Sequence, residues 1–141
     1  MLTVAFAALH YLALGIGVAG IWIRARGFRA RDLATVFYGD NLWGIAALLW
    51  IGTGLGRAFG GLEKGTDWYL HNPMFHVKMG LFGLAALLEL WPMVTLIRWR
   101  IRKDSVDMRL FPTFARISIV ELVILGLIPF AASAMARGVS W

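Results

Sequence analysis

Four long apolar segments, separated by polar connectors, constrain this chain more than any other feature of its sequence. They extend over residues 2–23, 39–59, 74–97 and 110–136. Each is close to the roughly 20 apolar residues that an α-helix needs to cross the hydrocarbon core of a bilayer. Because lipid offers the backbone no hydrogen-bonding partners, spanning segments of this length fold as helices. We therefore expect an all-α fold, a single four-transmembrane-helix bundle over residues 1–141.

The composition supports a membrane location and excludes several classes of protein. Hydrophobic residues make up 60% of the chain and charged residues 16%, whereas soluble domains average about 45–50% and about 25%. A soluble domain of this size could not bury so much apolar surface, so we expect the lipid bilayer to cover it. The chain has no cysteine, which excludes disulfides, zinc–thiolate sites, iron–sulfur clusters and thiol nucleophiles.

Basic residues predict the orientation of the bundle. Nine of the 14 Lys and Arg residues follow the first or the third apolar segment: Arg24, Arg26, Arg29, Arg31, Arg98, Arg100, Arg102, Lys103 and Arg109. Positively charged connectors stay on the cytoplasmic side of a membrane. We therefore expect a multi-pass protein of the bacterial inner membrane with both termini on the outer, periplasmic side. The net charge of +6 then reflects topology and lipid headgroups, and we expect no nucleic-acid partner.

Ionisable residues inside the apolar segments carry the functional information. They are His10, Asp40, His76, Lys78, Glu89, Arg116 and Glu121. A charge at the bilayer centre costs about 2.5–3.5 kcal/mol on insertion scales, so such residues pair with one another or line a cavity. At 1.5 Å of rise per residue, two layers are expected. The outer layer holds His10, His76 and Lys78, and the inner layer holds Glu89, Glu121 and Arg116, with Asp40 at its edge.

Helical geometry predicts which of these side chains share a face. Lys78 and Glu89 are eleven residues apart and differ by only about 20° around the helix, so both should point into the bundle. His76 lies about 160° from Lys78 and points elsewhere unless Pro73 distorts the first turn. Arg116 could instead extend to the lipid headgroups. The two glutamates could be purely structural.

The same residue types suit several kinds of chemistry. Neutral histidine is a common axial ligand of haem iron, and helix bundles offer the slot for the cofactor. A lysine nearby could pair with a propionate group. Buried carboxylates exchange protons near neutral pH, because burial raises their pKa. Ion or metal movement fits the same set of residues.

The order of these residues resembles two families of bacterial membrane proteins. The first segment has His10, then Ala19-Gly20 and Arg24; the third opens with Phe75-His76-Val77-Lys78; the last has Arg116 and Glu121 before Pro129-Phe130. This pattern is similar to the HemJ type of protoporphyrinogen oxidase and, more distantly, to CopD copper-resistance membrane domains. It also looks like a sister family of predicted four-helix bacterial membrane proteins with no assigned function.

The HemJ resemblance implies haem b as cofactor and a function in redox or tetrapyrrole chemistry, including porphyrinogen oxidation, with a porphyrin or quinone partner. It implies His10, His76, Lys78 and Arg116 as cofactor-binding residues, and Lys78 as a catalytic one. We assign proton handling to Glu89 and Glu121. It also implies a homo-oligomer, for which glycine-lined helix faces offer close contacts.

Two other hypotheses remain open. The first is a non-enzymatic membrane carrier or copper-handling protein of the CopD type, in which His10 and His76 bind the metal. Methionines such as Met74 and Met79 would add soft sulfur donors for Cu(I). The second is a structural membrane protein whose polar groups only fix the register of the helices.

Overall fold

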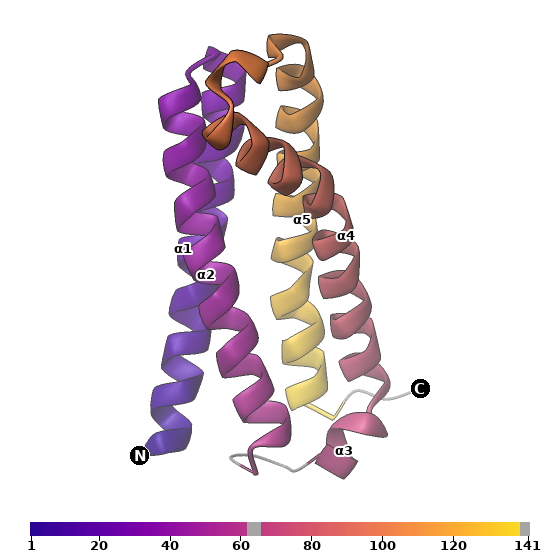
Figure 1. The fold of residues 1–141 in the computed structure, drawn as a ribbon. Helices are drawn as coiled ribbons and strands as arrows, with labels where there is room; N and C mark the ends of the chain where they lie inside the picture. Colours follow the sequence, from indigo (N-terminus) through magenta and orange to yellow (C-terminus); the bar gives the residue numbers. More distant parts are fainter. Residues whose placement is uncertain (62–65, 139–141) are drawn as a thin grey trace.

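The computed structural model describes residues 1–61 and 66–138, and this part of the chain contains helices and no strand. The four long helices in Figure 1 are α1 (Leu2–Ala30), α2 (Leu33–Phe59), α4 (Pro73–Ile101) and α5 (Phe111–Ala136). The shorter elements are α3 (Thr66–Leu70) and the 3-10 turns η1 (Lys103–Ser105) and η2 (Met108–Leu110). In the described part of the chain, four helical stretches are long and apolar enough to cross a membrane. The predicted all-α class is confirmed.

The helices extend beyond the predicted segments, mostly where polar residues continue the same helix. α1 runs seven residues past Ile23, and α2 begins at Leu33 rather than at Gly39. The Asp32 side chain caps α2 by accepting hydrogen bonds from the backbone N–H groups of Ala34 and Thr35. Such capping satisfies amide groups that have no partner within the helix. The connector between α1 and α2 is therefore a tight turn, and the arginines assigned to it lie largely on α1.

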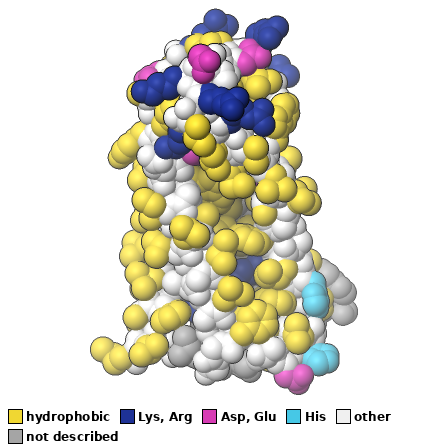
Figure 2. Space-filling model, viewed as in Figure 1, with side chains coloured by type: hydrophobic (Ala, Val, Ile, Leu, Met, Phe, Trp, Pro, Cys, Tyr) yellow, Lys and Arg dark blue, Asp and Glu magenta, His cyan; other side chains and the backbone are white. Residues whose placement is uncertain are grey.

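α1 packs along both α2 and α5, and α4 packs along α5. The start of α1 and the end of α5 lie at one end of the bundle, which we call the termini end (Figure 1). The α1–α2 turn and the η1–η2 segment lie at the other, the connector end. Lys and Arg side chains gather at the connector end, and hydrophobic side chains cover most of the rest of the visible face (Figure 2). The sidedness of the termini stays a prediction.

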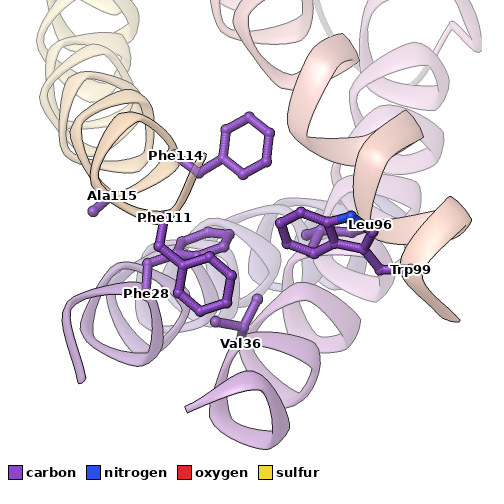
Figure 3. Close-up of a cluster of buried hydrophobic side chains, with 7 residues drawn as sticks. All are labelled: Phe28, Val36, Leu96, Trp99, Phe111, Phe114 and Ala115. Atoms are coloured by element: carbon purple, nitrogen blue, oxygen red, sulfur yellow. The ribbon is translucent and has the colours of Figure 1, made fainter. Parts of the chain in front are cut away.

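Three apolar layers fill the interior at different heights, and the one near the termini end contains Ala58, Tyr69, Met74, Phe75 and Met135. The layer near the connector end, shown in Figure 3, joins side chains of all four long helices: Phe28, Val36, Leu96, Trp99, Phe111, Phe114 and Ala115. The middle layer joins residues of α1, α2 and α5: Ala13, Ile21, Trp43, Trp50, Leu125 and Ile128. The ionisable residues lie on either side of this middle layer.

Glycines bring α1 and α2 into backbone contact between the connector-end layer and the middle layer. A Cβ atom at Gly39 would lie 2.5 Å from the backbone nitrogen of Arg24 and 2.6 Å from the carbonyl oxygen of Gly20. Small residues permit this approach between membrane helices. The contact holds Arg24 of α1 beside Asp40 of α2. By contrast, Gly15 and Gly52 have nothing within 4 Å of an added Cβ, and self-association through these faces stays a prediction.

Candidate functional site

The most strongly connected polar group is Arg24, whose side chain is completely buried (0% exposed). Its terminal nitrogens form a bidentate pair with Glu89, with both distances at 2.7 Å. They also donate to Glu121 Oε2 at 2.8 Å and to Asp40 Oδ1 at 3.1 Å. The Nε–H donates to the Ser118 hydroxyl at 3.3 Å. One guanidinium thus links all four long helices.

A second arginine completes this group at its edge. Arg100 donates to Asp40 Oδ2 at 2.8 Å and to the Phe37 carbonyl at 3.3 Å. Its guanidinium also lies 4.5 Å from the centre of the Phe37 ring. Figure 1 shows α4 turning across the bundle in its second half, where Pro92 interrupts the helical hydrogen bonds. That turn carries Arg100 to α2. We call Arg24, Asp40, Glu89, Arg100 and Glu121 the Arg24 cluster.

The structure corrects the predicted inner layer. Glu89 and Glu121 do lie together, but their partner is Arg24, which the hydropathy pattern predicts to lie in a connector and which lies within α1. Arg116 is exposed, because the face of α5 that carries it points away from the bundle. The missed signal was the spacing of Gly17, Gly20, Arg24 and Gly27, which places the arginine on the same helix face as the packing glycines.

A cavity of about 280 Å³ lies on the other side of the middle layer, toward the termini end. Residues of all five helices line it, and both His10 and Lys78 are among them, together with Arg57. Its walls are rich in aromatic side chains: Trp50, Trp68, Tyr69, Phe75 and Phe82. We call this space the His10 cavity. It combines apolar walls with basic groups, as in sites for amphipathic small molecules.

The His10 imidazole is held in one orientation. It is buried, and its Nδ1 lies 2.9 Å from the Thr53 hydroxyl oxygen. The Thr53 hydroxyl lies 2.6 Å from the Leu49 carbonyl oxygen, to which it donates. The hydroxyl proton is therefore used, so the Thr53 oxygen accepts a hydrogen bond from His10 Nδ1–H. In a neutral imidazole with this tautomer, Nε2 carries the lone pair.

The two predicted histidines are not part of one site. His76 is exposed, and its Nε2 lies 2.8 Å from the Leu70 carbonyl oxygen. It does not line the His10 cavity, whereas Met79 does and Met74 is buried elsewhere in the apolar core. Within residues 1–61 and 66–138, no group of three or more His, Asp or Glu side chains is arranged to hold a metal ion.

The fold and these two polar sites define a helical membrane protein with an ionic cluster in one half and a cavity in the other. The chain belongs to the family described as Predicted membrane protein (DUF2214), whose model matches residues 2–140. No curated protein and no solved structure matches the chain. The resemblance to HemJ and CopD proteins is not shown by these comparisons and stays a prediction.

Proposed function

We propose that the protein binds a tetrapyrrole, haem b, in the His10 cavity and acts in membrane redox chemistry of the HemJ type. The observation that carries this proposal is the orientation of His10 by Thr53. A histidine that ligates a metal usually donates its other ring N–H to a protein acceptor, which fixes the tautomer and the ring plane. With Nδ1–H donating to Thr53, Nε2 is the ring nitrogen that would ligate iron.

The cavity walls fit the rest of such a ligand. The Trp50 ring centre lies 5.7 Å from that of His10, and the aromatic walls offer flat apolar surface to a macrocycle. Lys78 and Arg57 supply positive charge for propionate carboxylates. The volume of about 280 Å³ is at the lower limit of small-molecule sites, which span roughly 300–1,000 Å³. A tetrapyrrole would therefore fill the cavity and extend to its open side.

The reaction that we propose within this class is oxidation of a porphyrinogen, with a membrane quinone as electron acceptor. Bound haem would supply one-electron chemistry, while His10 holds the cofactor and Lys78 binds a carboxylate of cofactor or substrate. With the termini end on the periplasmic side of a bacterial inner membrane, as the basic connectors predict, this site would open in the outer half of the bilayer.

The proposal is tested by the absorption spectrum of protein purified after expression with excess haem precursor. We expect a Soret band in the wild-type protein and its loss in His10→Ala. His76→Ala is the matched control, because His76 lies outside the cavity, and this variant should keep the band. A wild-type protein without a Soret band, or equal bands in wild-type and His10→Ala protein, would contradict the proposal.

A further inference from the structure

The Arg24 cluster is also a binding site, and we propose that its ligand is a single exchangeable proton carried by Glu121. The inference concerns the half of the bundle opposite the His10 cavity and is independent of haem binding. It rests on three observations: the use of every donor of Arg24, an oxygen of Glu121 that no donor reaches, and the balance of charges in the cluster.

All the donors of Arg24 are already used. A guanidinium has five N–H groups in a fixed planar arrangement. Nε–H donates to Ser118, the two N–H groups of one terminal nitrogen to Asp40 and Glu89, and those of the other to Glu89 and Glu121. The arginine therefore has no further hydrogen to offer the carboxylates that surround it.

One carboxyl oxygen is left without a donor. Glu121 is 1% exposed, and no N–H or O–H group in the described part of the chain reaches its buried Oε1. The carboxyl groups of Glu121 and Glu89 accept hydrogen bonds from the same terminal nitrogen of Arg24. Two ionised carboxylates that share one donor nitrogen repel each other, and a proton on one of them removes this repulsion.

The balance of charges in the Arg24 cluster also favours one bound proton. Arg24 and Arg100 supply two positive charges, and Asp40, Glu89 and Glu121 supply three negative charges when all are ionised. Apolar layers lie on both sides of the cluster: Figure 3 shows the one toward the connector end, and the other contains Ile21, Trp43 and Leu125. A net charge is costly in such surroundings, and one bound proton makes the cluster neutral.

Glu121 is the carboxyl group that carries this proton. Glu89 receives two hydrogen bonds from Arg24, and Asp40 receives one from each arginine, so both are held as carboxylates. Glu121 receives one from Arg24 through Oε2. The other charged side chains of the cluster are Arg24 on α1, Asp40 on α2, and Glu89 with Arg100 on α4.

The proton has a route of exchange at the edge of the cluster. The side chains of Asp40 and Arg100 are 17% and 33% exposed, whereas that of Glu121 is 1% exposed. Protons therefore enter or leave past the Asp40–Arg100 pair. Uptake forms an O–H bond on Glu121 and removes one negative charge, and release restores the carboxylate; no oxidant or second reactant takes part.

Infrared spectroscopy of the full chain in lipid nanodiscs tests this proposal. A protonated carboxylic acid has a carbonyl stretch that is distinct from the carboxylate bands and shifts in D₂O. We expect this band at neutral pH in wild-type protein, its disappearance at high pH, and its absence in Glu121→Gln. Glutamine has nearly the shape of glutamate and keeps an oxygen that accepts from Arg24, so this variant should fold. Asp104→Asn, at an exposed carboxylate, is the control and should keep the band.

A second measurement does not depend on a variant. Wild-type protein with carbon-13 in its glutamate side chains should show the isotope shift on the protonated-acid band, because the proton lies on a glutamate and not on Asp40. A neutral-pH spectrum without a labelled protonated-acid band would overturn the proposal. Persistence of the full band in folded Glu121→Gln would overturn it as well.

Discussion

Within residues 1–61 and 66–138, Arg24 is the one cationic side chain that donates to Glu89 and Glu121, and replacing it by methionine removes these hydrogen bonds. Each of these glutamates loses every hydrogen bond that it receives from a cationic group in the described structure. Breaking a buried ion pair by removing one partner costs about 3–5 kcal/mol, because the other charge remains buried without compensation. Glu89 is left as a buried carboxylate without its partner and Glu121 loses the donor to its Oε2, so we expect the free energy of unfolding to fall by at least about 3 kcal/mol.

A triple variant separates this unpaired-charge effect from lost packing. In this variant methionine replaces Arg24, Glu89 and Glu121 together, so the buried centre of the cluster becomes apolar. Asp40 keeps its contact with Arg100. Replacing a buried ionic group by hydrophobic residues of similar volume is often neutral, or stabilising by about 1–4 kcal/mol. We therefore expect the triple variant to be more stable than the single variant, although it differs more from the wild type.

Unfolding in mixed micelles with increasing SDS, followed by tryptophan fluorescence and circular dichroism, measures both differences. A single variant within about 1 kcal/mol of wild type would show that Arg24 does not hold the cluster together. A triple variant as unstable as the single one would show that lost packing, and not unpaired charge, causes the destabilisation.

Three further predictions concern helix contact and the cavity. Gly39→Ala should reduce the free energy of unfolding by about 1–3 kcal/mol through overpacking, because its Cβ would meet the Arg24 backbone. Gly44→Ala is the control: its Cβ has open space, so this variant should be neutral or stabilising. Equal losses of stability in SDS unfolding would refute this prediction. Thr53→Val should weaken haem binding about 10–100-fold by releasing the His10 ring, and an unchanged titration would refute it. Lys78→Met should weaken binding of haem more than of a haem dimethyl ester, and equal weakening would exclude propionate pairing.

The fold could be predicted from the sequence because its main determinant is local. Four apolar segments of spanning length lead to four helices whatever their contacts. The ends of the helices are predicted less accurately than their number. A helix continues through polar residues when they cap it or face a headgroup region, as α1 does beyond Ile23. Hydropathy alone does not detect such a continuation.

The candidate sites could be predicted only in part. Depth along the helices placed Glu89 and Glu121 together, because both lie at similar heights on adjacent helices. Their partner was assigned wrongly because Arg24 and Arg116 both lie toward the same end, and the choice between them depends on helix rotation. The contact of Gly20 with Gly39 sets that rotation for α1. How closely the two backbones approach there can be seen only in the three-dimensional structure.

His10 and His76 show the same limit at the other end of the bundle. Their order in the sequence suggested one site, but the first turn of α4 directs His76 to the Leu70 carbonyl oxygen. Asn72 caps this turn and Pro73 begins it, so the helix starts with regular geometry and His76 stays on the outer face. The hydrogen bond from His10 to Thr53, which carries the proposed function, joins residues of different helices and could not be derived from spacing.

The most direct test of the proposed function is an equilibrium titration of haem into purified protein in lipid nanodiscs, followed by Soret absorbance and quenching of tryptophan fluorescence. The wild-type protein should bind one haem per chain saturably, and His10→Ala should bind at least about tenfold more weakly, as expected when an iron ligand is lost. Equal affinity of the two proteins, or no saturable binding by the wild type, would contradict the assignment of the His10 cavity as a haem site.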